Sequence, residues 1–381
     1  MDLFTFQYTQ DSGWSVDEFP AVDSEQTLLL VFGGHSFLQD DAVIQNLLQH
    51  YPSSYAIGCS TAGEIFDGKI YDDSLSVAVL HFQQTRVKFV CSHVVDDSQT
   101  EAVAHKLATD LAADNLAAVL LFNDGLHING SALIRGLHGV FDQKVPVTGG
   151  MAGDGEMFEH TWVLCNGKLK ENHIAMLGMY GDALCFQYGS KGGWDIFGPE
   201  RKVTRSENNV LYELDGKPAL SLYKDYLGEL AEGLPATGMM FPLLVFSEQQ
   251  QDLVRTIIGV NEDDGSLTLA GDIAQGASTK LMHANFDHLV TGASEAAGEI
   301  KFDCCCNNDQ TLALAISCFG RRKVLKDRTE EEVEAVRDVL SGDIKITGFY
   351  SYGEFSPLSS GTCDLHNQTM TITLISEQCD S

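Results

Sequence analysis

Three acidic residues that each follow a glycine are the first candidates for chemistry in this chain. They are Glu64, Asp154 and Glu354, which end the segments GCSTAGE, GGMAGD and GFYSYGE. Each follows a predicted strand that comes after a helix, and ligands of open α/β sheets bind at that edge of the sheet. The carboxylates could accept hydrogen bonds from a ligand amine or hydroxyl; the alternative is a tight turn in which the acid caps neighbouring backbone N–H groups. We expect a functional role for Glu354 because Tyr350 and Tyr352 flank it with aromatic surface.

Other residue types give weaker chemical signals. Arg321 could bind a carboxylate through two hydrogen bonds, and the alternative is an ion pair with a helix acid. None of the 12 histidines forms an HxxxH or HxH pair, so no local zinc site is indicated, whereas a haem iron needs only one protein ligand and spacing does not exclude it. Cys318 has no histidine base nearby in the sequence, and no GxSxG motif occurs.

An internal repeat positions the three glycine–acid corners. Residues 27–82, 116–165 and 311–375 each read as strand, helix, strand, glycine–acid corner and returning strand, and the same spacing separates Phe32 from Glu64 and Phe122 from Asp154. Asn129 is expected to cap the second helix, and Thr329 with Glu332 forms a capping box for the third. Each helix has one apolar face, so we predict a mixed α/β fold of repeated β-α-β units with antiparallel return strands and helices outside the sheets.

Two further segments, 177–188 and 253–269, are typical of β-hairpins, the second with its turn at 261–265. A length of 381 residues fits two or three domains, and we place a boundary near residue 220.

Composition excludes several classes of protein. The formal charge of −30 argues against binding to nucleic acid or to an anionic membrane surface. No apolar run reaches the length of a membrane span, and residues 1–14 lack the features of a signal peptide, so we expect a cytoplasmic protein. The ten cysteines are then expected to be reduced, buried thiols. This includes Cys304, Cys305 and Cys306, a poor metal site because adjacent strand residues point to opposite faces, although a redox role stays open.

The motifs resemble those of the FIST family. The resemblance rests on the three corner segments, Gly271-Asp272, and the stretch LHNQTMT at 365–371. It implies a FIST N-terminal domain over 1–220 and a FIST C-terminal domain over 221–381. It also implies a sensory role in bacterial signal transduction. Some stand-alone members bind haem b, sense nitric oxide and regulate a histidine kinase or a cyclic-di-GMP enzyme, and others are proposed to bind amino-acid-like molecules.

We therefore predict a haem or small-molecule pocket near the domain junction, with no assigned metal ligand. Its predicted residues are Glu354, Tyr350 and Tyr352 in the lining, Arg321 and His366 beside it, and Glu64 and Asp154 at the equivalent corners. Two alternatives are an enzyme that uses the acidic corners for acid–base chemistry and an interaction scaffold with an acidic surface.

Overall fold

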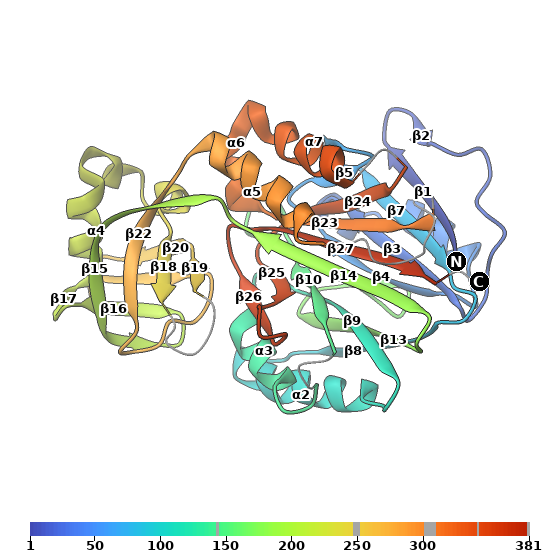
Figure 1. Cartoon of the computed structure of the whole chain (residues 1–381), viewed down its shortest axis with the longest axis horizontal. Coiled ribbons are helices and arrows are strands. Elements are labelled where there is room, and N and C mark those ends of the chain that lie inside the picture. Colours follow the sequence, from blue (N-terminus) through green and yellow to red (C-terminus); the bar gives the residue numbers. More distant parts are fainter. Residues whose placement is uncertain (142–144, 247–251, 301–309, 341–342, 379–381) are drawn as a thin grey trace.

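The computed structural model describes the chain apart from residues 142–144, 247–251, 301–309, 341–342 and 379–381. Three sheets with their helices form a body, made of residues 1–191 and 286–378, and a separate sheet forms a small domain, residues 194–284 (Figure 1). The chain crosses between the two at residues 192–193 and again at 285. The predicted mixed α/β class is confirmed.

The predicted triplication is present in the body. In each repeat the first two strands are parallel, a helix connects them, and a later strand returns antiparallel to the first. The first repeat has β3 (Thr27–Gly33), α1 (Ala42–Gln49), β4 (Tyr55–Ser60) and β7 (Leu75–His81). The second has β9 (Leu116–Asn123), α3 (Gly130–Leu137), β10 (Val147–Met151) and β13 (His173–Tyr180). The third has β23 (Leu312–Cys318), α7 (Thr329–Leu340), β24 (Lys345–Ser351) and β27 (Met370–Glu377).

Each repeat also lends a hairpin to the sheet of another repeat. The hairpin β5–β6 (Glu64–Phe66, Lys69–Tyr71) pairs with β24, and β25–β26 (Glu354–Pro357, Cys363–His366) pairs with β10. The hairpin β11–β12 (Val163–Cys165, Lys168–Lys170) pairs with β4. The first repeat thus extends the third, the third extends the second and the second extends the first, which closes the three sheets into a ring.

The outer edge of each sheet is an additional strand. These strands are β1 (Asp2–Thr9) with the short β2 (Gly13–Trp14), β8 (Arg86–His93) and β14 (Leu184–Lys191). The predicted hairpin over 177–188 is wrong, because β13 pairs with β8 and β9 whereas β14 pairs with β27. Between them the chain turns at Gly181, whose φ of 114° favours glycine, and passes from one sheet to another.

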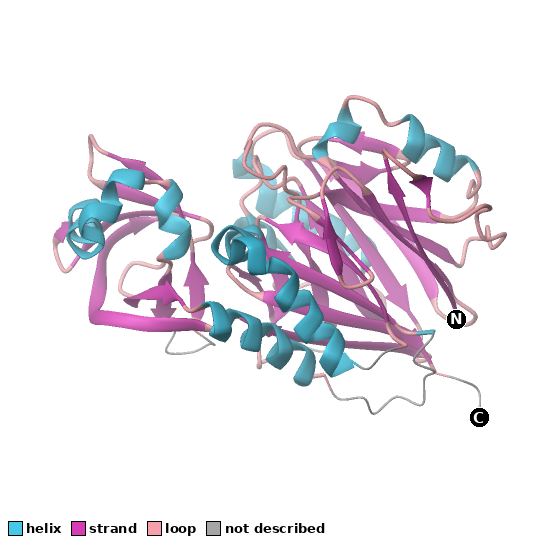
Figure 2. Cartoon of the chain, turned by 90° about the horizontal axis from the view of Figure 1, so that it is seen from above, coloured by secondary structure: helices cyan, strands magenta, loops and turns pink. Residues whose placement is uncertain are grey.

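Side chains alternate between a central core and the helix layers. Leu28, Leu30 and Phe32 point into a core shared by all three sheets, while Leu29 and Val31 face the layer that contains α1. Strands buried on both faces explain the continuous apolar runs of the sequence. The helices α2 (Thr100–Leu111), α5 (Phe286–Gly298) and α6 (Phe319–Leu325) also pack on outer faces. Figure 2 shows helices outside the sheets, which is the predicted arrangement.

The small domain is an insertion between β14 and α5, ahead of the first strand of the third repeat. It contains the helix α4 (Ala219–Leu227) and the strands β15 (Trp194–Glu207), β16 (Val210–Leu214), β17 (Lys217–Pro218), β18 (Leu243–Phe246), β19 (Leu253–Arg255), β20 (Ile257–Asn261), β21 (Ser266–Leu269) and β22 (Ser278–Ala284). The predicted second hairpin is present as β20–β21. Residue 220 lies inside this domain, and segments from both sides of it share sheets; the division into 1–220 and 221–381 stays a prediction.

The prediction of reduced cysteines is wrong for one pair, because a disulfide joins Cys91 to Cys165. The two lie on strands of different sheets, β8 and β11, so no local spacing in the sequence indicates the pair. Cys59, Cys318 and Cys363 are free and buried, as predicted, and Cys185 is buried as well. Cys304, Cys305 and Cys306 lie outside the described residues. In the part of the chain that the structure describes, no helix is both long enough and apolar enough to cross a membrane.

Candidate functional site

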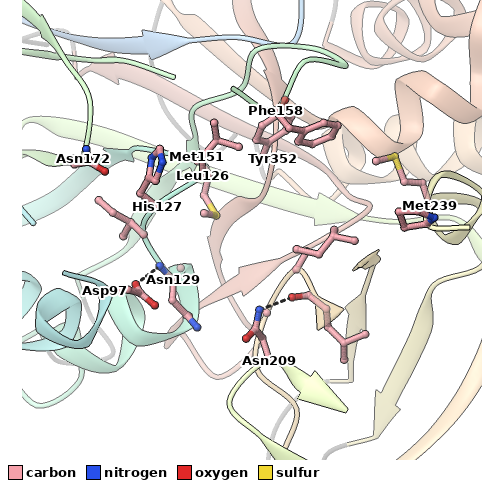
Figure 3. Close-up of a pocket in the computed structure, with 18 of the residues that line it drawn as sticks. Asp97, Leu126, His127, Asn129, Met151, Phe158, Asn172, Asn209, Met239 and Tyr352 are labelled. Carbon is pink, nitrogen blue, oxygen red and sulfur yellow. Dashed lines mark hydrogen bonds between the residues drawn. The ribbon is translucent and has the colours of Figure 1, made fainter. Parts of the chain in front are cut away.

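A cleft of about 860 Å³ separates the second repeat of the body from the small domain. Its body wall comes from the segments 94–97 and 125–130, together with Met151, Phe158, Asn172 and Tyr352. Its small-domain wall comes from Asn209, the segments 233–236 and 269–271, Met239 and Ile258 (Figure 3). Met151 ends β10 and Gly125 follows β9, so the cleft lies at the carboxyl ends of parallel strands, where α/β sheets bind ligands.

The buried carboxylate of Asp124 fixes the floor of the cleft. Its Oδ1 accepts the backbone N–H groups of Leu126 and His127, both at 2.9 Å, and its Oδ2 accepts the N–H of Asn172 at 2.8 Å. The Nδ1 atom of His127 lies 3.2 Å from the same Oδ1. Asp124 therefore holds two cleft-lining segments in register and orients the His127 ring, whose side chain is 51% exposed.

Helix α3 begins at the cleft and anchors the small domain. Asn129 caps it as predicted, since its Oδ1 accepts the N–H of Ala132 at 2.9 Å. Its Nδ2 donates to Asp272 of the small domain at 3.1 Å, and the Ser131 hydroxyl accepts the Asp272 N–H at 2.9 Å. Arg135 completes this contact with an ion pair to Asp272. The Gly271-Asp272 motif thus joins the small domain to the first turns of α3.

The LHNQ residues at 365–368 form a second contact between body and small domain. Buried Arg255 of the small domain donates to the Leu365 carbonyl at 3.0 Å, and Gln368 donates in return to the Met239 carbonyl at 3.0 Å. Met239 lines the cleft, so the hydrogen bond from Gln368 fixes the backbone position of a cleft residue.

Of the seven predicted site residues, Tyr352 lines the cleft. Its ring stacks on Phe158 with the ring centres 4.9 Å apart and the planes at 17°. Its hydroxyl donates to the carboxylate of Asp154, which also accepts the backbone N–H groups of Phe158, Glu159 and His160. The structure therefore brings Tyr352 and Asp154 together. The hydrogen bonds that Asp154 accepts also fix the loop that contains Phe158.

Glu64 and Glu354 are fully buried at equivalent corners and do not line the cleft. Glu354 accepts from the Ser351 hydroxyl at 2.7 Å, and from the hydroxyl and N–H of Thr369 at 2.8 and 3.1 Å. Glu64 accepts from the Thr61 hydroxyl, and from the hydroxyl and N–H of Ser74 at 2.8 and 2.9 Å. Both carboxylates make the backbone contacts of the capping alternative; a role in ligand binding stays a prediction.

Arg321, Tyr350 and His366 are also buried away from the cleft lining. Arg321 pairs with Glu332 of α7 at 2.8 Å, which is the helix-acid alternative, and Tyr350 donates to the other oxygen of Glu332 at 2.8 Å. The Nε2 atom of His366 lies 3.0 Å from the Ser356 carbonyl, and burial lowers the pKa of this histidine. The structure brings Arg321 and Tyr350 together in one network, and their contact with a ligand likewise stays a prediction.

Burial gives Glu354 a pH-dependent effect on stability. Loss of hydration raises its pKa from 4.5 to about 7, against the opposing effect of its hydrogen bonds. A carboxyl whose pKa is higher in the folded state costs stability as pH rises from the unfolded pKa through the folded one. In Glu354→Gln, whose amide can keep the contacts with Ser351 and Thr369, we expect the free energy of unfolding relative to wild type to increase by about 2–3 kcal/mol between pH 5 and pH 8. Urea denaturation of both proteins at each pH measures this difference in the free energy of unfolding.

The control for this prediction is Glu330→Gln, at an exposed position of α7, which should change little relative to wild type over the same range. A difference between Glu354→Gln and wild type that stays constant with pH would show that Glu354 does not take up a proton near neutrality.

Most residues of the cleft have no signal in the sequence. The sequence predicts Asn129 as a helix cap only, and no pattern in it assigns a role to His127, Asn172, Asn209 or Met239. The one usable signal is the end of β9, where Asp124 and Gly125 follow the last strand residue, Asn123.

Two known proteins are similar to this chain. The uncharacterized protein MJ1623 of Methanocaldococcus jannaschii is 28% identical over 339 residues, which is 82% of this chain and 62% of that protein. The chain thus spans less than two thirds of the length of this curated relative. A cyanuric acid hydrolase from A. caulinodans aligns over 93% of this chain and 90% of its own, with 9% identity and a TM-score of 0.36, too weak a likeness to support an argument.

Family models match most of the chain. The FIST N domain matches residues 27–217 and the FIST C domain matches residues 219–357, and FIST domains are associated with sensing in signal transduction. From these two matches and the corner motifs, the chain belongs to the FIST family.

Proposed function

We propose that this protein is a sensor that binds a small organic molecule in the cleft between body and small domain. The observation that supports the proposal is that both parts contribute to the wall of one cavity of about 860 Å³. Small-molecule sites have volumes of roughly 300–1,000 Å³, a largely apolar lining and a few placed polar groups, as this cleft has. A ligand here contacts both parts at once.

Ligand binding is proposed to act through the position of the small domain. A ligand that fits one arrangement of the two walls better than another increases the population of that arrangement. The contacts of Asp272 with α3 and of Gln368 with Met239 adjoin the cleft and would transmit the change. The family resemblance suggests a histidine kinase or a cyclic-di-GMP enzyme in the cytoplasm as the partner that receives the signal.

A haem-based nitric oxide sensor is the second candidate, and His127 favours it. A ring proton on Nδ1, shared with Asp124, would leave Nε2 to bind an iron, an arrangement common among metal-binding histidines. A haem carries two negatively charged propionates. The described lining has no lysine or arginine to pair with them and contains the acidic residues Asp96 and Asp97. As a whole the described lining does not fit haem, and no step of the proposed function passes through it.

An absorption spectrum of protein expressed with a haem supply tests the second candidate. We expect no intense Soret band. A band at near one haem per chain that shifts with nitric oxide and disappears in His127→Ala would replace the small-molecule proposal with the haem sensor.

A variant that fills the cleft tests the first proposal. Ala236 is exposed on the small-domain wall, so Ala236→Trp should occupy the cleft without disturbing a core. In a thermal-shift screen of amino acids, amines and organic acids, we expect at least one compound to raise the Tm of the wild type by several degrees and to leave Ala236→Trp unchanged.

The control is Ala113→Trp, an exposed alanine outside the cleft lining, which should respond like the wild type. If every stabilising compound raised the Tm of Ala236→Trp equally, the cleft would not be the binding site.

A further inference from the structure

The walls of the cleft have an excess of negative charge. Asp96, Asp97 and Asp124 lie on or directly behind the body wall, and the described lining residues include no lysine or arginine. Two arginines that contact Asp272, next to the lining residue Gly271, already have partners. Arg135 pairs with Asp272 and Glu101, and Arg255, buried behind Gly271, donates to the carbonyls of Asp272 and Leu365. Such a cleft favours a cationic ligand over an anionic one.

Hydrogen bonds to one carboxylate oxygen of Asp97 hold its side chain in place. Its Oδ1 accepts the backbone N–H of Asn129 at 2.7 Å and the hydroxyl of Thr100 at 3.0 Å (Figure 3). Its Oδ2 has no hydrogen-bond partner among the described residues, and the side chain belongs to the cleft lining. A carboxylate fixed through one oxygen is prepared to accept a charge-assisted hydrogen bond at the other.

Apolar side chains on both walls of the same cleft are exposed. Val95 and Phe158 on the body are 76% and 46% exposed, and Ile258 on the small domain is 46% exposed. Phe158 is supported from behind by its stack on Tyr352. These side chains offer apolar and aromatic contact surface, and an aromatic face also attracts a cation.

We propose that the cleft binds an organic amine, whose ammonium group binds Asp97 and whose apolar part contacts Phe158 and the opposite wall. The inference rests on the proposed function, since it names the chemical class of the ligand of the same site. It differs from an amino acid, whose carboxylate would find no cationic side chain among the described lining residues.

Matched compounds that differ only in charge test the class. Isothermal titration and thermal shift compare the full chain with 2-phenylethylamine and 3-phenylpropionate, and with tryptamine and indole-3-propionate. We expect both amines to bind and both acids to fail. In Asp97→Asn, whose amide oxygen still accepts from Asn129 and Thr100, amine affinity should fall about tenfold or more, while the exposed Asp114→Asn stays like the wild type.

The outcomes separate this inference from the proposed function. Tighter binding of the acids, or an unchanged affinity of Asp97→Asn for the amines, would overturn the amine assignment while the cleft remained the site. Absence of binding by either amine would also overturn the amine assignment. Equal binding of the amines by the wild type and Ala236→Trp would instead overturn the cleft as the sensory site.

Discussion

Replacing Arg321 with methionine is expected to lower the free energy of unfolding by about 3–5 kcal/mol, because it leaves Glu332 charged and buried without its ion-pair partner. The guanidinium also donates to the carbonyls of Gly192, Leu289 and Gln368, so the substitution removes a donor from three further acceptors, of which those of Leu289 and Gln368 are buried. Urea denaturation of the full chain measures the loss.

Two variants make this expectation specific. Arg328→Met breaks an exposed ion pair with Glu331 and should have a much smaller effect. Combining Arg321→Met with Glu332→Leu removes both buried charges and should recover part of the stability. If Arg321→Met were as mild as Arg328→Met, the ion pair with Glu332 would not contribute to stability, and the predicted ligand-binding role of Arg321 would be favoured instead.

Gly348→Ala is expected to lower the free energy of unfolding by more than about 3 kcal/mol or to prevent folding. In β24 this glycine lies opposite Ala315 of β23, and an added Cβ would overlap the Ala315 carbonyl oxygen. Backbone atoms of a central strand cannot move aside without breaking the ladder. Gly58 and Gly149 hold the same position in the other two repeats, against the carbonyls of Val31 and Leu121, and should respond alike.

The control is Gly298→Ala near the end of α5, where an added Cβ meets nothing within 4 Å. Alanine in a helix is favoured over glycine by about 0.5–1 kcal/mol, so this variant should be slightly stabilised. A mild effect of Gly348→Ala in denaturation or circular dichroism would contradict the close strand approach that the three repeats share.

The repeated unit was predictable because its signals are local. Apolar runs such as Thr27–Gly33 and the Asn129 cap depend on neighbours a few residues away. The exchange of hairpins between repeats was not predictable, because the pairing of β5 with β24 joins residues that are far apart in the chain. No local pattern in either segment identifies its partner strand. The disulfide between Cys91 and Cys165 follows from the same kind of packing between sheets.

The corner acids show that local spacing can place a residue in the fold without determining its environment. Their spacing predicted strand ends, and they stand there, yet Glu64 and Glu354 are sealed inside the protein. A local signal for this was present: a hydroxyl residue three positions earlier, Thr61 or Ser351, donates to each carboxylate. The cleft depends instead on a small domain placed by Asp272 and Arg255, whose contacts cross more than one element and have no local pattern.

The most direct test of the account is a crystal structure of the full chain with the compound that stabilises it most. We predict that the bound molecule lies in the cleft, with contacts to Phe158 on one wall and Met239 on the other, and with its polar group at Asp97. A molecule bound outside the cleft, such as in the groove beside Arg322 and Lys326, would contradict the assignment of the sensory site to the junction of body and small domain.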